Sequence, residues 1–209
     1  PYTTLFRSVE NNMAIEYPMF CYQCEQTAGG KGCTKMGVCG KTPEIAALQD
    51  LLIYQIKGIS CYAKEIVEKG ENVDKDIVSF IEDTLFTTLT NVNFDADVHV
   101  ELLRRSQEIK EQLRSKVGCI KNTTEHATYN LSSTKAEMLQ DAKKAGIMYD
   151  QDLDPDIRSL RQTIVYGLKG ISAYGHQARE LGYYDDQVDN FYIRALRSEE
   201  RRVGKECRS

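Results

Sequence analysis

The sequence has no run of apolar residues long enough to cross a membrane, and it lacks the charged leader and apolar core of a secretory signal. It also has no stripe of lysine and arginine, and its formal net charge is -4 at pH 7. We therefore expect a cytoplasmic protein that has neither a membrane nor a nucleic acid as a partner. Alternation of apolar and polar residues, which is typical of a half-buried β-strand, is missing too, and this predicts an all-α fold.

The chain is also poor in groups that could do acid–base chemistry together. Its three histidines, His99, His126 and His176, do not have the spacing of metal ligands, and the carboxylates are spread over the expected helix faces without an evident acid–base pair. We therefore expect no catalytic residue within this chain. With 209 residues, of which 41% are hydrophobic, it is nevertheless long enough to bury a core of its own.

Cysteine, by contrast, is concentrated in one place. Four of the seven cysteines lie in the stretch CYQCEQTAGGKGCTKMGVCGK, at Cys21, Cys24, Cys33 and Cys39, separated by two, eight and five residues. A Cys-x-x-Cys pair lets neighbouring thiolates bind one ion or one corner of a cluster, and a glycine-rich loop can bring in two more. All-sulfur ligation suits an iron–sulfur cluster or zinc. Structural zinc more often uses two Cys-x-x-Cys pairs, so the spacing favours iron–sulfur and leaves zinc, disulfides and free thiols as alternatives.

The rest of this loop suits thiolate ligation. Its glycines provide unusual backbone angles and let amide N–H groups approach the sulfur atoms, and its lysines can offset the negative charge of a thiolate-bound group. These residues are Gly29, Gly30, Gly32, Gly37, Lys31, Lys35 and Lys41. We expect the four sulfur atoms to lie close together in the folded chain.

Apolar residues recur every three or four positions in four long stretches, which predicts four long helices. They cover residues 42–70, 73–90, 95–117 and 154–182. Thr42 followed by Pro43 is a good start signal for the first helix. A shorter helix is expected after Thr134, because Thr134 and Glu137 have the spacing of a capping box. The polar segment 121–130 shows no period and predicts a loop.

The first and last of these helices are similar to one another. TPEIAALQDLLIYQIKGISCYAKEIVEKG, residues 42–70, aligns without gaps to DPDIRSLRQTIVYGLKGISAYGHQARELG, residues 154–182, and both contain the run KGIS. The similarity continues into the following helix of each copy, which predicts two tandem, duplicated helical bundles. Gly58 and Gly170 lie in mid-helix, where glycine costs about 0.5–1 kcal/mol relative to alanine, so we expect a close helix crossing at each.

The two ends of the chain look foreign to this pattern. PYTTLFRS at the start and RSEERRVGKECRS at the end resemble translated sequencing adapters, and neither continues the apolar period of its neighbour. The second copy is expected to be truncated, because a third helix follows the first copy alone, and an apolar face of the second copy should therefore be exposed. We expect a non-native leader over 1–12, the cysteine-rich loop over 13–41, a first bundle over 42–118, a second, incomplete bundle over 119–196 and a non-native tail over 197–209.

The stretch MFCYQCEQTAGGKGCTKMGVCGKTPEIAALQDLLIYQIKGIS resembles the amino-terminal signature of the hybrid cluster proteins, also called prismane proteins or hydroxylamine reductases. The likeness continues through DIRSLRQTIVYGLKGISAY, so it covers the chain from about Met19 to Leu196. It implies a helical first domain with two bundles and a cubane [4Fe–4S] cluster. Family members with wider cysteine spacing carry a [2Fe–2S] cluster, whereas the spacing here is similar to the [4Fe–4S] kind. The positions that match the family's cluster ligands are Cys21, Cys24, Cys33 and Cys39.

What the resemblance implies about activity concerns a longer protein. Family members are much longer than this chain, and the ligands of their catalytic hybrid iron–sulfur–oxygen cluster lie in later α/β domains that this chain lacks. The resemblance implies reduction of hydroxylamine to ammonia, with nitric oxide reduction also attributed to the family, and a redox protein as electron donor. We expect this chain to hold the electron-relay part and to be inactive alone. The alternative is a zinc-stabilised helical interaction module without a redox role.

Overall fold

The structure is a computed structural model that describes residues 19–120, 124–149 and 153–199. Within these ranges the chain forms helices, and its only strand-like pairing is an isolated bridge between Cys21 and Cys33. The predicted all-α fold is confirmed. No helix in these ranges is both long and apolar enough to cross a membrane. The helices are η1 (Ala28–Gly30), α1 (Pro43–Glu68), α2 (Lys75–Thr87), α3 (Ala96–Val117), α4 (Glu125–Thr128), α5 (Lys135–Asp141), η2 (Ala142–Lys144), α6 (Pro155–Glu180) and α7 (Asp186–Glu199).

The chain ends that we expect to be non-native fall mostly outside this description. The leader, 1–12, lies outside the described residues, and so does the tail beyond residue 199. Residues 197–199 continue α7, whose Leu196 is fully buried. The structure therefore leaves the assignment of both ends as a prediction.

The helices begin close to where the sequence predicts. The Thr42 hydroxyl oxygen accepts a hydrogen bond from the Ile45 N–H at 3.3 Å at the start of α1. The Asp95 carboxylate caps α3 in the same manner, and Thr134 and Glu137 form the predicted capping box at α5. The first N–H groups of a helix have no partner inside it, so these side chains stabilise each start and make it recognisable in the sequence.

The segment expected to be an irregular loop, 121–130, contains one short helix. The start of α4 is capped by the Thr124 hydroxyl oxygen, which accepts a hydrogen bond from the Ala127 N–H at 3.4 Å. Ala127 is buried, and its carbonyl oxygen accepts a hydrogen bond from the Tyr62 hydroxyl at 3.2 Å. A single turn is too short to show helical periodicity and gains its stability from such tertiary contacts, so the sequence pattern misses it.

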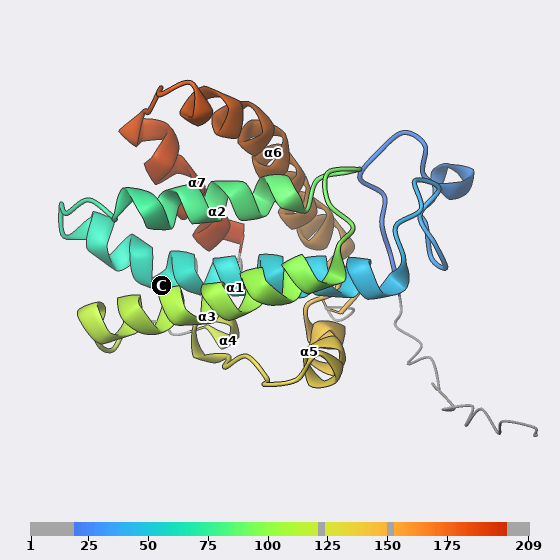
Figure 1. Cartoon of the computed structure of the whole chain (residues 1–209), viewed down its shortest axis with the longest axis horizontal. Coiled ribbons are helices and arrows are strands. Elements are labelled where there is room, and N and C mark those ends of the chain that lie inside the picture. The colour runs from blue at the N-terminus through green and yellow to red at the C-terminus, as the bar shows by residue number, and fades with distance from the viewer. Residues whose placement is uncertain (1–18, 121–123, 150–152, 200–209) are drawn as a thin grey trace, which may run out of the picture.

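The central element of the molecule is α1 (Figure 1). α3 runs along one side of it, α7 packs on another side, and α2 packs against α6. The helices of the second copy thus share a core with those of the first. The largest hydrophobic cluster includes Ile56 and Ile59 from α1, Ile81 from α2, Leu168 from α6 and Tyr192 from α7.

A buried ion-pair network adds a polar connection between the copies. Arg179 of α6 pairs with Glu82 of α2, with 3.0 Å between Nε and Oε1, and with Asp189 of α7, with 3.0 Å between Nη2 and Oδ1. Because all three side chains are largely buried, loss of Arg179 would leave two buried carboxylates without the positive charge that they share. This cost favours one arrangement of α2, α6 and α7.

The two KGIS runs differ in what surrounds their glycine. A Cβ at Gly58 would lie 2.3 Å from the carbonyl oxygen of His126, so α1 and α4 approach too closely for a side chain at this point. A Cβ at Gly170 would meet nothing within 4 Å in the part of the chain that the structure describes. The predicted close crossing is therefore found at Gly58 and not at Gly170.

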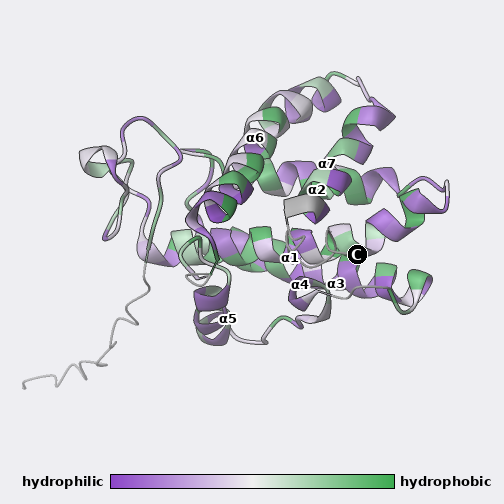
Figure 2. Cartoon of the chain, turned by 180° about the vertical axis from the view of Figure 1, so that it is seen from behind, coloured by the Kyte–Doolittle hydropathy of each residue, from purple (hydrophilic) through white to green (hydrophobic). Residues whose placement is uncertain are grey.

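Hydrophobic residues recur along α6 (Figure 2), and on one face of this helix their surroundings differ from those of the equivalent residues of α1. On α1, the apolar residues of this face are covered by α3, α4 and α5. On α6, the equivalent residues are exposed, which confirms the expected exposed apolar face. Leu48, Leu52, Ile59 and Tyr62 are 0%, 0%, 0% and 3% exposed, whereas Leu160, Ile164, Ile171 and Tyr174 are 65%, 37%, 39% and 80% exposed.

Alanine substitutions at the two KGIS glycines should have opposite effects on stability. Gly58→Ala would force a Cβ against a backbone oxygen and should lower the free energy of unfolding by about 1–3 kcal/mol. Gly170→Ala would enter open space and remove the conformational cost of a helical glycine, so it should raise the free energy of unfolding by about 0.5–1 kcal/mol. Urea unfolding followed by circular dichroism measures both changes, with unchanged m-values as a control. Equal effects would contradict the difference in packing.

Candidate metal centre

The cysteine-rich loop precedes α1 and projects beyond the start of that helix (Figure 1). Two backbone hydrogen bonds join the segment around Cys21 to the segment around Cys33. The Cys21 N–H donates to the Cys33 carbonyl oxygen at 3.1 Å, and the Cys33 N–H donates to the Cys21 carbonyl oxygen at 2.8 Å. The Thr27 hydroxyl donates to the same oxygen of Cys21 at 3.1 Å. The loop therefore folds back on itself, which places the first and third cysteines of the motif opposite each other.

Cys33 is the buried one of the four loop cysteines, and its sulfur has hydrogen-bond partners within the loop. Its side chain is 5% exposed, and its Sγ accepts a hydrogen bond from the Ala28 N–H at 3.4 Å. The Thr27 hydroxyl lies 3.7 Å from the same sulfur. Backbone N–H groups of Ala28 and Val38 lower the pKa of the Cys33 thiol, because they stabilise negative charge on the sulfur. This thiol thus loses its proton more readily than a free cysteine does, and the thiolate is the form that binds metals.

A tight turn surrounds Cys39. The Gly37 N–H donates to the Lys41 carbonyl oxygen and the Gly40 N–H donates to the Gly37 carbonyl oxygen, both at 2.8 Å. A Cβ at Gly37 would lie 2.9 Å from Cys39 Sγ and 3.0 Å from the Cβ of Lys41. Gly40 has a φ of 88°, a left-handed conformation that favours glycine. These two glycines allow the chain to turn while leaving space for the sulfur.

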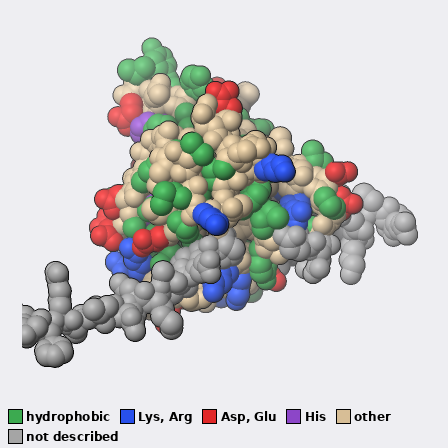
Figure 3. All heavy atoms as spheres, turned by 90° about the vertical axis from the view of Figure 1, so that its right-hand side faces the viewer, with side chains coloured by type: hydrophobic (Ala, Val, Ile, Leu, Met, Phe, Trp, Pro, Cys, Tyr) green, Lys and Arg blue, Asp and Glu red, His purple; other side chains and the backbone are tan. Residues whose placement is uncertain are grey.

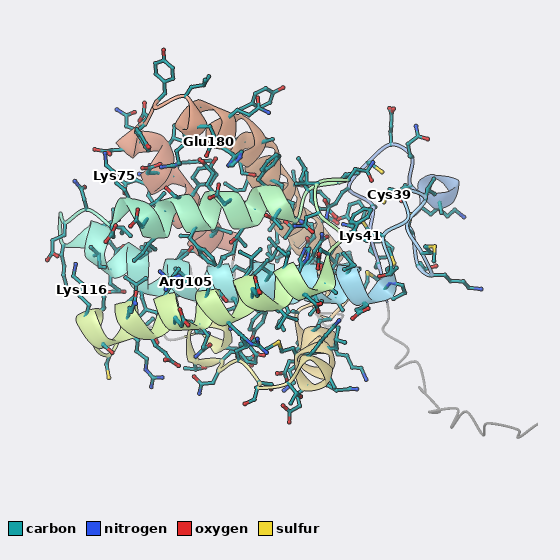
Figure 4. The ribbon with its side chains drawn as sticks, in the orientation of Figure 1. Cys39, Lys41, Lys75, Arg105, Lys116 and Glu180 are labelled. Carbon is teal, nitrogen blue, oxygen red and sulfur yellow. The ribbon has the colours of Figure 1, made fainter. Side chains whose placement is uncertain are left out.

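The four sulfur atoms do not all gather in the structure. Within residues 19–120, 124–149 and 153–199, no three or more cysteine, histidine or carboxylate side chains are close enough together to hold a metal ion. The expected convergence is therefore not found, although the backbones of Cys21 and Cys33 are paired and Cys39 lies on the projecting loop (Figure 4). Cysteine ligands lose their protons when a metal binds, and such sites commonly form together with their metal. The ligand assignment stays a prediction.

The lysines expected to offset thiolate charge differ in burial. Lys31 and Lys35 are exposed, whereas Lys41 is 2% exposed and its Nζ donates a hydrogen bond to Gln49 Oε1 at 2.6 Å. The side-chain nitrogen of Gln49 lies 3.3 Å from Nε2 of the buried His99. Burial lowers the pKa of His99, which suits a neutral ring that positions Gln49. Lys41 thus brings an anchored positive charge to the end of the loop, where the loop meets the helices (Figure 4).

Further charged residues near the loop are not singled out by the sequence pattern. Asp50 and Lys57 of α1 and Lys169 of α6 line a cavity of about 20 Å³, together with Gln23 of the loop and Tyr166 of α6. Burial raises the pKa of Asp50 and lowers the pKa of Lys169. The sequence offers one signal for this group of buried charged residues: both KGIS runs begin with a lysine.

The other two histidines lie in separate parts of the bundle. Nδ1 of His176 is 2.8 Å from Oδ1 of Asp83 and connects α6 to α2. The ring of His126 in α4 packs on Tyr54 of α1, with 4.0 Å between the ring centroids. Both histidines therefore have structural contacts within the helical bundle, away from the cysteine loop.

The surface at the loop end of the molecule carries few charges. Seen from this end, hydrophobic side chains and isolated lysines stand among uncharged atoms, and acidic side chains gather toward the edges (Figure 3). Met36 and Val38, which lie between the third and fourth cysteines, are 58% and 63% exposed. The outer part of the loop is thus accessible, and it exposes two apolar side chains beside the exposed Lys31 and Lys35.

The fold and the loop together define a class: an all-α protein with a glycine-rich, four-cysteine loop at one end of its helices. The Prismane/CO dehydrogenase family matches residues 19–202, from just before the first cysteine of the loop to beyond α7. The chain belongs to this family. The resemblance to the hybrid cluster, or prismane, proteins is thereby confirmed.

Curated relatives carry the name hydroxylamine reductase. The chain is 46% identical over 182 residues to the protein of Syntrophobacter fumaroxidans and 42% identical over 178 residues to that of Desulfovibrio desulfuricans. It is 39% identical over 182 residues to that of Methanococcus vannielii. These alignments cover 85% of this chain and 33%, 32% and 33% of the relatives. The chain therefore spans about a third of the length of the curated relatives that it matches.

Gly37→Ala should weaken metal binding while leaving the helices intact. The new Cβ would lie 2.9 Å from Cys39 Sγ and would displace the sulfur or the turn that holds it. We expect a loss of about tenfold or more in metal affinity, the scale typical of changes beside metal ligands. Competition with a chelator measures the affinity. Met36→Ala, on the exposed neighbouring side chain, is the matched control and should bind metal as the unsubstituted chain does.

Proposed function

We propose that this chain is the electron-relay part of a hydroxylamine reductase. Cys21, Cys24, Cys33 and Cys39 bind a [4Fe–4S] cluster, which receives electrons from a redox partner protein in the cytoplasm. The full-length protein reduces hydroxylamine to ammonia at a hybrid cluster whose ligands lie outside this chain. The observation that carries the proposal is the four-cysteine loop, with its spacing of two, eight and five residues, in a chain that aligns with hydroxylamine reductases.

The chemistry of the donor set fits such a cluster. The loop offers four thiols and no histidine, and all four are free of disulfides. Cys33 Sγ already accepts a backbone hydrogen bond, and bonds of this kind tune cluster-bound sulfur. Lys41 adds a buried positive charge at the base of the loop, where it can offset the charge of four thiolates.

When bound, an iron–sulfur cluster supplies one-electron redox chemistry. The residues of this chain hold the group, stabilise thiolate charge and place the outer loop at the surface, where Met36 and Val38 are accessible to a donor protein. Four cysteines complete the ligation of a cubane, so they leave no position for substrate. These roles favour electron relay over catalysis within this chain.

Metal analysis distinguishes this proposal from the zinc-stabilised module. After anaerobic purification we expect iron and acid-labile sulfide in similar amounts and little zinc. Cys21→Ser, Cys24→Ser, Cys33→Ser and Cys39→Ser should each lower the iron and sulfide content. Cys119→Ser removes an exposed thiol outside the loop and is the matched control. Stoichiometric zinc without sulfide would refute the redox role and favour the module.

The cluster-loaded chain should take up electrons without turning over hydroxylamine. Reduction by dithionite should bleach its visible absorption, because the four cysteines hold a redox-active group. Ammonia production should stay at the level of the buffer control, because no ligand position is open to substrate. Steady ammonia production that is lost in Cys21→Ser would contradict this expectation.

A further inference from the structure

The cysteine loop presents two positively charged and two apolar side chains to solvent. Lys31, Lys35, Met36 and Val38 are all exposed, and we call these four residues the outer surface of the loop. At this end of the molecule, acidic side chains gather toward the edges of the view (Figure 3). Protein interfaces commonly have an apolar core and a polar, solvent-accessible rim, and these four side chains supply both kinds of group.

This outer surface lies next to two of the motif sulfurs. Backbone N–H groups of Ala28 and Val38 hydrogen-bond to Cys33 Sγ and lower the pKa of that thiol. The side chain of Val38 is exposed, so this residue reaches from the sulfur to the surface. Cys39 Sγ lies against Gly37, the residue before Val38, where a Cβ would be 2.9 Å from the sulfur. A molecule that covers Val38 and its neighbours therefore comes close to both sulfurs.

The loop differs in charge from the chain as a whole. Residues 19–41 contain three lysines and one carboxylate, that of Glu25, whereas the whole chain has a formal net charge of -4. Lys41 is buried at the base of the loop. Water screens the exposed Lys31 and Lys35, so they offset thiolate charge less than Lys41 does. They can still attract an oppositely charged molecule as it approaches, and the loop therefore selects negative charge in a partner.

We propose that the outer surface of the loop docks a small acidic electron-carrier protein, which gives its electron to the cluster held by the four cysteines. This inference rests on the proposed function and names the chemistry of the donor. Lys31 and Lys35 pair with carboxylates of the carrier, and Met36 and Val38 meet apolar side chains among them. One electron leaves the reduced carrier and enters the oxidised cluster, so no bond forms or breaks. Contacts of so few side chains are typical of weak, short-lived complexes between redox partners.

The rate of reduction by an acidic carrier tests this role. The probe is a reduced, acidic [2Fe–2S] ferredoxin, and stopped-flow absorbance follows its oxidation by the cluster-loaded full chain. The second-order rate constant per loaded cluster should fall as salt is added, because ions screen the attraction between the two proteins. In the double variant Lys31→Glu with Lys35→Glu, it should be about tenfold lower at low salt and should lose most of its dependence on salt.

The double variant Met36→Ala with Val38→Ala tests the apolar contact. It keeps every charge of the loop and the N–H group of residue 38. The rate constant should therefore fall while its dependence on salt is retained. This variant also tests the proposal if the charge-reversed chain does not load a cluster.

Lys75→Glu with Lys116→Glu is the matched control. Both lysines are exposed and lie at the opposite end of the molecule from Cys39, so the net charge changes equally but away from the loop (Figure 4). This variant should keep the rate constant and salt dependence of the unsubstituted chain. Equal rate constants for the two charge-reversed variants, or no reduction of the loaded chain by the ferredoxin, would overturn this inference alone. Lysine-dependent binding to anionic phospholipid vesicles, with unchanged rate constants, would assign the surface to a membrane instead. If the unsubstituted chain binds no iron and sulfide, the proposed function fails and this inference fails with it.

Discussion

The packing of the second helical copy onto the first is the interaction on which the rest of the molecule depends. Leu168 and Tyr192 enter the same core as the central residues of α1, and Arg179 pairs with Glu82 of α2. Because α6 is held in this way, Tyr166 reaches the cysteine loop, although the two are far apart in the sequence. The surroundings of the loop therefore come from both copies, and neither copy alone could supply them.

The two sides of the cysteine loop differ in their exposure to solvent and in the charged groups beside them. The outer part of the loop is exposed, whereas its base is attached to the bundle by the hydrogen bond from Lys41 to Gln49. Behind the loop, the buried Lys41, Lys57 and Lys169 interact electrostatically with one carboxylate, that of Asp50. A negative group in the loop would thus be attracted toward the bundle while its other side stays near the surface. Such placement suits a centre that exchanges electrons with a partner and interacts with the rest of its own protein.

Local features of this fold could be predicted from the sequence, and long-range ones could not. Caps such as Thr42 and Thr134 act within four residues, so their pattern is visible in the sequence and the structure confirms them. Asp50 and Lys169 look like ordinary polar positions on helices, because their burial depends on how α1 and α6 meet. The gathering of the four sulfurs was expected and is not found among the described residues, and metal sites of this kind commonly form together with their metal.

The lysine and the glycine of the KGIS run occur in both helical copies, but only the lysine has the same surroundings in both. Lys57 and Lys169 face one cavity, so a single environment accounts for both. Gly58 and Gly170 have different environments, because the carbonyl of His126 presses on the first and nothing described here lies near the second. A mid-helix glycine without a close neighbour costs stability and offers no packing in return. The glycine of the first KGIS run therefore permits a close contact between α1 and α4, whereas the glycine of the second run has no such contact among the described residues.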